Sequence, residues 1–200
     1  NYTDANFLQV ANPLKGLQRL AEKYRAQFDV PVVGITGSNG KTIVKEWLYQ
    51  LLSPERIITR SPRSYNSQIG VPLSVWLMTE RTELGIFEAG ISEMGEMEAL
   101  QSIIRPNIGV LTNIGGAHQE NFYTLTDKCM EKLALFKECD VVIYDADNEL
   151  ISECVSKSLF GAREIAWSKR DSERPLYIER VVKGETTTTI HYRYLGMQNE

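Results

Sequence analysis

The stretch GITGSNGKT, from Gly34 to Thr42, decides the fold of this 200-residue chain. It matches the phosphate-binding pattern GxxxxGK[ST] in full and lies between a predicted strand and a predicted helix. In such a loop the glycines let backbone N–H groups turn toward a phosphate, the lysine adds a cation, and the last hydroxyl can bind Mg²⁺. The sequence therefore predicts a nucleotide site made by Thr36, Gly37, Ser38, Asn39, Gly40, Lys41 and Thr42.

Around this loop, short apolar runs alternate with helical patterns, which is typical of βαβ units. We expect strands at residues 32–36, 57–60, 84–89, 108–113, 141–145 and 164–167, and helices at 41–52, 70–78, 95–104, 126–138 and 148–159. The predicted fold class is α/β, a P-loop NTPase-like, mostly parallel sheet with helices on both faces, plus a C-terminal β-hairpin. The expected parts are a lead-in segment with a linker helix at 1–30, the ATP-binding domain at 31–170, and a hairpin at 171–200 that ends a truncated domain.

The composition places any phosphate binding in a local site. Hydrophobic residues make up 42% and charged residues 24%, as in ordinary globular proteins, and the net charge of −4 gives no general attraction to nucleic acid or anionic membrane. The three cysteines are odd in number and form no CxxC motif, so neither a disulfide framework nor a zinc site is indicated. No apolar run reaches the ~20 residues of a membrane span, and no signal-peptide pattern is present, so we expect a cytoplasmic protein.

Four polar residues outside the loop can be interpreted from their positions alone, and only Glu88 leaves two roles open. Glu88 ends an apolar run and is either a Mg²⁺ ligand or a helix cap, and the neighbouring loop favours the ligand. Glu96 falls in a first helical turn, which favours a structural role. Asn66 suits a turn or cap. Lys132 lies on a helix that is expected to bury Leu125, Cys129, Leu133 and Phe136, and the pattern alone indicates a solvated lysine.

Five segments, in order, resemble motifs of the Mur ligase family, the ATP-dependent amide-forming enzymes of peptidoglycan synthesis. They are TGSNGKT at 36–42, YNSQIGVPL at 65–73, EAG with a later GE at 88–96, TNIGGAH at 112–118, and EKLALF at 131–136. The spellings are most similar to the branch that adds D-alanyl-D-alanine to UDP-N-acetylmuramoyl-tripeptide, and they hint at a lineage in which this ligase is fused to an alanine racemase. Ser64 and Ser67 depart from the more asparagine-rich family pattern.

The resemblance implies a reaction and a set of roles. ATP would phosphorylate the tripeptide carboxylate, and the amine of D-alanyl-D-alanine would attack the acyl phosphate. The implied catalytic residues are Lys41, Asn66, His118 and Lys132, with Asn113 near the nucleotide. Thr42 and Glu88 would hold one Mg²⁺, and His118 with a carbamylated Lys132 a second. Family members also have an N-terminal and a C-terminal domain for the two substrates, so the chain is interpreted as an ATP-binding fragment, inactive alone.

Two other classes stay open at this point. One is another Mur-type ligase, such as a folylpolyglutamate synthase, although those loops more often end in Gly-Lys-Gly-Ser. The other is a non-ligase P-loop NTPase that acts as a switch or motor. That class needs an aspartate at the strand end where this chain has Glu88.

Overall fold

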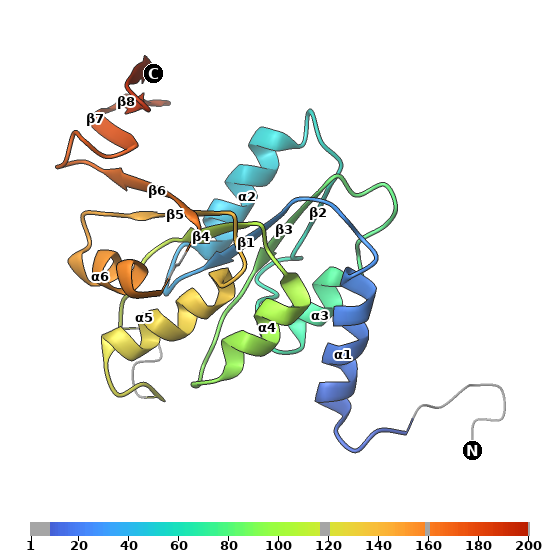
Figure 1. Cartoon of the computed structure of the whole chain (residues 1–200). Helices are drawn as coiled ribbons and strands as arrows, with labels where there is room; N and C mark the ends of the chain where they lie inside the picture. Colours follow the sequence, from blue (N-terminus) through green and yellow to red (C-terminus); the bar gives the residue numbers. More distant parts are fainter. Residues whose placement is uncertain (1–8, 117–120, 159–160, 200) are drawn as a thin grey trace.

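The computed structural model describes residues 9–116, 121–158 and 161–199, and it forms one mixed sheet with helices on both faces (Figure 1). The strand order is β2-β3-β1-β4-β5-β6-β7-β8-β9. The strands are β1 Val32–Thr36, β2 Ile58–Arg60, β3 Leu84–Glu88, β4 Ile108–Leu111, β5 Val141–Asp145, β6 Arg163–Ser168, β7 Leu176–Lys183, β8 Thr188–Tyr194 and β9 Met197–Asn199. The helices are α1 Pro13–Arg25, α2 Lys41–Leu52, α3 Gly70–Val75, α4 Glu96–Ile104, α5 Leu125–Leu133, a 3₁₀ turn η2 Ala134–Phe136, and α6 Glu149–Ser158.

Strand β1 lies at the centre of the parallel part of the sheet. Its Val33 pairs with Ile86 of β3 on one side and with Ile108 of β4 on the other, and both pairings are parallel. Because β1, β3 and β4 are parallel, the loops that follow them leave the same edge of the sheet. The order of the strands along the chain also reverses at β1. Ligands of open α/β sheets bind at such a point, and the glycine-rich loop begins here.

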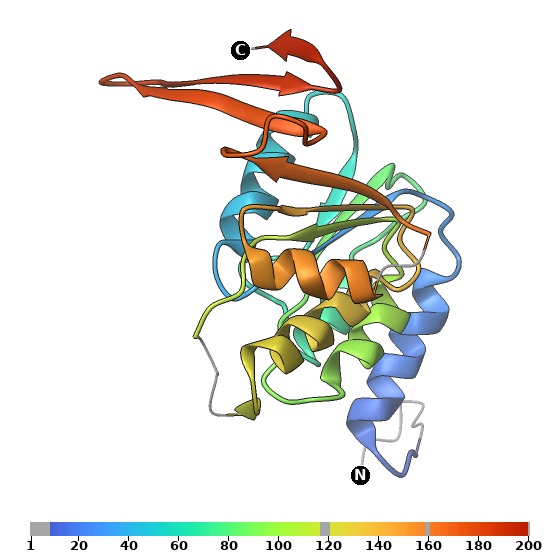
Figure 2. The same ribbon diagram turned by 60° about the vertical axis from the view of Figure 1, so that its left-hand side comes forward.

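Successive residues of β1 point to opposite faces of the sheet, and each face has its own cover. Val33 and Ile35 pack with Val44 and Leu48 of α2. On the other face Val32 belongs to a larger cluster supplied by the remaining helices, α1, α3, α4, α5 and α6. Figures 1 and 2 show α2 on its own side of the sheet, away from α4, α5 and α6.

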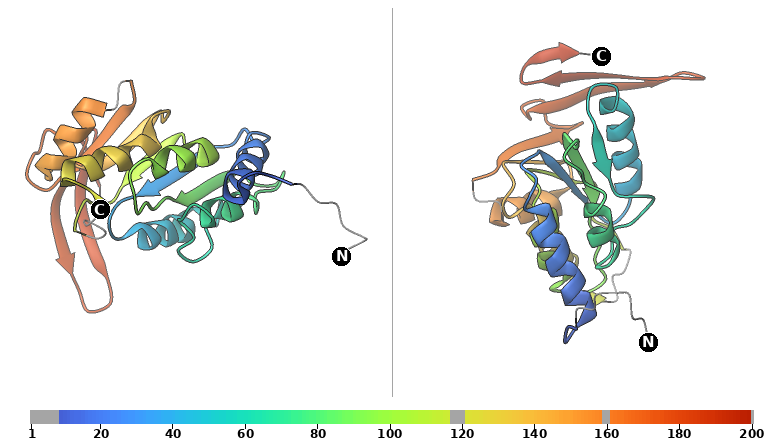
Figure 3. Two further views of the ribbon diagram at one scale, coloured as in Figure 1. Left: turned by 90° about the horizontal axis from the view of Figure 1, so that it is seen from below. Right: turned by 90° about the vertical axis from the view of Figure 1, so that its right-hand side faces the viewer.

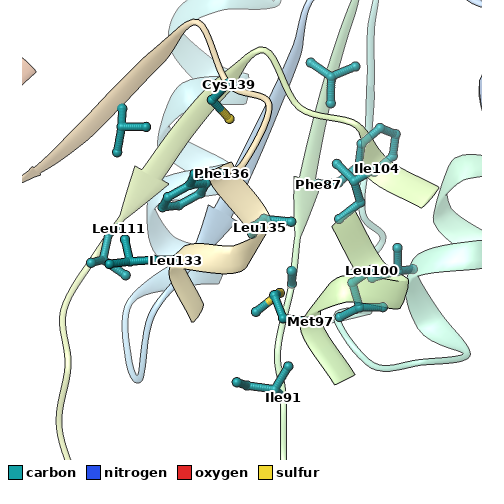
Figure 4. Packing of buried hydrophobic residues seen from close by; sticks show 14 of the residues in the cluster. Phe87, Ile91, Met97, Leu100, Ile104, Leu111, Leu133, Leu135, Phe136 and Cys139 are labelled. Carbon is teal, nitrogen blue, oxygen red and sulfur yellow. The ribbon is translucent and has the colours of Figure 1, made fainter. Parts of the chain in front are cut away.

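The larger cluster is the main core of the protein. Figure 4 shows Phe87 of β3 close to α4, and Phe136 of η2 beside Leu111 and Leu133. The three cysteines are free, and all are buried. Among the described residues, no helix combines the length and apolar character that crossing a bilayer requires.

The observed elements confirm the predicted α/β class, with differences at element ends. The predicted helix 70–78 ends at Val75, and the predicted helix 126–138 divides into α5 and the tighter η2 turn. The linker helix expected within residues 1–30 is α1, which ends at Arg25. Leu125 was expected in the core but is 41% exposed, because α5 begins there with Thr124 as its cap.

The predicted C-terminal hairpin is present and is formed by β7 and β8. Strand β7 pairs in parallel with β6, and then β8 and β9 add antiparallel strands, so the hairpin continues the same sheet. It projects from one end of the sheet, as Figure 3 shows in two views. The sequence analysis missed β9, a strand of only three residues.

Candidate functional site

The predicted phosphate loop connects β1 to α2 in a conformation that requires two of its glycines. Gly37 and Gly40 have φ values of 142° and 80°, in the left-handed region that side chains disfavour. A Cβ at Gly37 would lie 2.0 Å from the Thr112 side-chain oxygen. The backbone of the loop therefore turns at the two glycines, and the side of Gly37 is closed by Thr112.

The residues after β4 brace this loop from the side. Ser38 N donates to the Asn113 carbonyl at 2.9 Å, and Asn39 N donates to Asn113 Oδ1 at 3.0 Å. The Gly115 amide donates to Ser38 Oγ at 2.9 Å. Asn113 thus lies beside the loop, as predicted. In the structure it holds the loop backbone through these two hydrogen bonds.

Lys41 and Thr42 begin α2 and lie where the motif places them. Lys41 Nζ donates to the Gly37 carbonyl at 2.8 Å, and burial lowers the pKa of this lysine while the Glu88 charge opposes the shift. The Thr42 hydroxyl donates to Glu88 Oε2 at 3.0 Å. Thr36 is fully buried and its hydroxyl donates to the Ala89 carbonyl, so its side chain joins β1 to the segment after β3.

Glu88 is a fully buried carboxylate at the end of β3. Besides Thr42, its Oε2 accepts a long hydrogen bond of 3.4 Å from Asn66 Nδ2. Its Oε1 lies 3.0 Å from the buried ammonium of Lys45. Asn66 also meets the backbone near Gly90, whose amide donates to the Asn66 carbonyl at 2.7 Å. The structure thus brings Thr42, Asn66 and Glu88 together.

Lys132 is buried, and the prediction of a solvated lysine from the helical pattern alone is wrong. Its exposure is 3%, because α5 packs this side toward the phosphate loop. Burial, followed by the positive charges of Lys41 and Lys128, lowers the Lys132 pKa to about 7. In the described ranges no hydrogen bond or ion pair to its ammonium is found. A lysine of this kind is largely a neutral amine just above pH 7.

A cavity of about 420 Å³ lies beside the phosphate loop. Among its lining residues are Gly37, Ser38, Lys41, Asn66 and Lys132. Glu96 also borders it, but its carboxylate accepts from the amides of Ser92 and Glu93, which fits the predicted structural role. His118 lies outside the described residues.

The oxygen donors here suit Mg²⁺. Thr42 supplies a hydroxyl and Glu88 a carboxylate, both hard ligands, and Mg²⁺ commonly takes only one or two carboxylates beside substrate phosphates and water. Glu88 Oε1 lies against the Lys45 ammonium, so Oε2, which faces the Thr42 hydroxyl, is the oxygen that a cation beside Thr42 would meet. No cluster of three or more His, Cys, Asp or Glu residues occurs among the described residues, so phosphate oxygens would have to complete the shell.

Two buried lysines near the site were missed by the sequence analysis. Lys45 contacts Glu88, and Lys128 donates to the Gly115 carbonyl at 2.6 Å. The signal for both was helical spacing: each lies four residues before or after a lysine predicted to act in the site, so it shares that residue's helix face.

Comparison with known proteins confirms the family resemblance predicted from the sequence. The family model described as Mur ligase middle domain matches residues 35–198. Two curated relatives are both named UDP-N-acetylmuramoyl-tripeptide–D-alanyl-D-alanine ligase. The Bacillus subtilis protein is 34% identical over 150 residues, and the Borreliella burgdorferi protein is 37% identical over 150 residues. Each alignment covers 74% of this chain but only 33% and 32% of the relative, so the chain spans about a third of their length.

A solved structure gives the same result at the level of the fold. The MurF ligase of Thermotoga maritima, solved in complex with ADP, superposes with a TM-score of 0.86 at 25% identity. The superposition covers 100% of this chain and 46% of that protein. The architecture described above, including the C-terminal strands, is therefore that of a part of this larger enzyme.

Proposed function

Because the chain belongs to the Mur ligase middle-domain family, we propose that it is the ATP-binding part of a ligase that adds D-alanyl-D-alanine to UDP-N-acetylmuramoyl-tripeptide. Both curated relatives carry that name, which favours this substrate pair over that of a folylpolyglutamate synthase. The reaction would be ADP-forming: a carboxylate takes the γ-phosphoryl group of ATP, and the amine then displaces phosphate to form the amide.

The observation that carries the proposal is the convergence of Lys41, Asn66 and Lys132 on one cavity beside the phosphate loop. In the first step a carboxylate must approach an already anionic triphosphate, so the site has to offset charge repulsion. The Lys41 ammonium would bind the phosphates together with backbone N–H groups of the loop. The Asn66 amide, which lines the same cavity, would contact the γ-phosphate or the incoming carboxylate.

Mg²⁺ would be held by Thr42 and Glu88, and when bound it would add positive charge where phosphoryl transfer builds negative charge. Glu88 is close to Thr42 before any ligand enters, since Thr42 already donates to it. Thr42 would give up this hydrogen bond and turn its hydroxyl oxygen to the ion.

Lys132 would carry CO₂ as a carbamate. The ammonium first releases one proton to solvent. The neutral amine nitrogen then attacks the carbon of CO₂, an N–C bond forms as one C=O π bond opens onto its oxygen, and a second proton leaves to solvent, so that overall a cation becomes an anion. Burial, a pKa of about 7 and a position on the cavity wall all suit this step. With His118, the carbamate would hold a second Mg²⁺. ¹³CO₂ added to the protein should give a carbamate ¹³C signal that is lost in Lys132→Met, and a signal that persists would exclude this lysine.

Substrate binding is proposed to need parts of the ligase beyond this chain, which spans a third of its relatives. Holding the acyl phosphate and the amine together is worth roughly 7–11 kcal/mol of the barrier. We therefore expect the 200 residues alone to bind ATP weakly and to catalyse no ligation. Calorimetry with ATP and Mg²⁺ tests the first part, and detectable amide formation would exclude the second.

The full-length protein tests the reaction itself. Phosphate release should require both UDP-N-acetylmuramoyl-tripeptide and D-alanyl-D-alanine. Release with a folate and glutamate would support a folylpolyglutamate synthase instead. Release that needs neither carboxylate nor amine would indicate a P-loop NTPase of another kind.

A further inference from the structure

Lys45 of α2 is a fully buried lysine that the proposed chemistry does not use. Its Nζ donates to the carbonyl of Ser61 at 2.9 Å and to the carbonyl of Arg63. It also lies 3.2 Å from Glu46 Oε1. Because the two carbonyls belong to the segment after β2, the ammonium is fixed from that side and cannot turn away from Glu88.

The two carboxylate oxygens of Glu88 therefore have different surroundings. Oε1 lies 3.0 Å from Lys45 Nζ, and both side chains have no exposed surface. Oε2 faces the Thr42 hydroxyl at 3.0 Å and the Asn66 amide at 3.4 Å. Hence Lys45 occupies one oxygen, and only the other is directed toward the phosphate loop.

This asymmetry bears on which ion the site accepts. Mg²⁺ is small and requires near-octahedral geometry, into which the two oxygens of a single carboxylate fit poorly. Ca²⁺ accepts six to eight ligands and often takes both oxygens. Resting on the magnesium site proposed above, we propose that Lys45 is a positioning residue that limits Glu88 to one-oxygen coordination and so favours Mg²⁺ over Ca²⁺.

A purely structural role for Lys45 makes a different prediction. If Lys45 only tied α2 to the segment after β2, its loss would disturb the loop and weaken both ions alike. The ratio of the affinities measured with Mg²⁺ and with Ca²⁺ separates these cases. General damage to the site lowers both affinities by the same factor and leaves their ratio unchanged.

The test uses the full-length protein and its Lys45→Met variant. Calorimetry would measure the affinity for ADP with Mg²⁺ and with Ca²⁺, and the ratio is compared between the two proteins, so that ion–ADP binding in solution cancels. We expect Lys45→Met to shift the ratio toward Ca²⁺ by about tenfold, because Glu88 can then offer both oxygens. An unchanged ratio would overturn the inference.

Arg25→Met is the matched control. Arg25 is also a buried cation, 5% exposed, that donates to backbone carbonyls, at 3.0 Å to Ile104 and 2.6 Å to Phe28, but it lies on α1 and contacts none of the site residues. Its replacement should lower stability and leave the ion ratio unchanged. A shift in this variant equal to that of Lys45→Met would also count against the inference.

A measurement on the unmodified protein applies even if Lys45→Met does not fold. In a crystal structure with Mg²⁺ and ADP, Glu88 should bind the ion through Oε2 alone, with Oε1 still beside Lys45. Coordination by both oxygens, or by neither, would overturn the inference. If neither ion changes the ADP affinity of the unmodified protein, the metal site itself is wrong, which is a different failure from an unchanged ratio.

Discussion

Helices α2 and α5 each carry two lysines one turn apart. Each pair includes a buried lysine near the site, Lys45 on α2 and Lys132 on α5, and these two lysines differ in their partners. On α2, Lys45 is buried against the carboxylate of Glu88. On α5, Lys132 is buried to nearly the same degree, but no ion pair to its ammonium is found among the described residues, and its pKa falls to about 7.

The comparison shows that burial alone does not decide what a lysine can do. A buried charge costs several kcal/mol unless a partner offsets it. Where the partner is present, the side chain serves as a fixed ion-pair member. Where it is absent, burial lowers the pKa of the amine, so that more of it is neutral near pH 7. The two helices thus hold a paired cation and an amine of lowered pKa, built from the same residue type.

The largest effect, on turnover, should come from replacing Lys41, which lies one turn before Lys45 on α2. Lys41→Ala in the full-length protein removes the cation that meets the phosphates, and we expect turnover to fall by roughly 10²–10³-fold with the fold intact. Steady-state phosphate release, with circular dichroism as a check on folding, measures this. Nucleotide affinity equal to that of the unmodified protein would mean that the loop is structural.

Lys45→Met should be strongly destabilising, because it leaves Glu88 buried without its cation. Removing one partner of a buried pair costs about 3–5 kcal/mol of unfolding free energy. Urea unfolding of the 200-residue chain would show this. The double variant Lys45→Met with Glu88→Gln should recover part of the loss, and no recovery would mean that the ion pair is not the cause.

Lys132→Met should change stability in the opposite direction and make the protein more stable. The unfolded lysine titrates near 10.5 and the folded one near 7, so folding releases a proton and is penalised at low pH. In CO₂-free buffer we expect the variant to be more stable, by on the order of 2 kcal/mol at pH 6. The advantage should shrink as pH rises from 7 toward 10. A variant less stable than the unmodified chain at pH 6 would break the comparison between the two helices.

The smallest effect concerns Glu131, which raises the Lys132 pKa slightly through its charge. Its Oε1 also accepts from the Met97 amide at 2.9 Å, and a glutamine can keep that bond. Glu131→Gln should therefore move the midpoint of carbamate formation to slightly lower pH, as followed by the ¹³C signal across pH 6–9. A midpoint that moves upward would contradict the assigned cause.

The fold class and the phosphate loop could be predicted from the sequence, for physical reasons. The phosphate loop and the central strands follow from glycine positions and from apolar runs that local rules describe well. Lys132 could not be placed by its pattern, since helical spacing around it cannot show that a second surface covers that side of α5. Leu125 was misplaced for a related reason: it starts the helix, where the apolar face has not yet reached the core.

The contacts that depend on three separate segments were beyond the sequence. Glu88 meets Lys45 from α2 and Asn66 from the loop before α3, and only the sheet order brings these together. The ordered motifs of the family indicated that the residues share a site. They did not indicate which oxygen faces which neighbour.

The hydrogen bond between Lys41 Nζ and the Gly37 carbonyl has a consequence for how phosphate enters. The lysine is stored on a neutral acceptor inside its own loop, 2.8 Å away. Entry of a phosphate is then an exchange of one acceptor for another, and the hydrogen bond to a charged oxygen is the stronger of the two. Nucleotide capture therefore resembles substitution at an occupied position more than docking into an empty one.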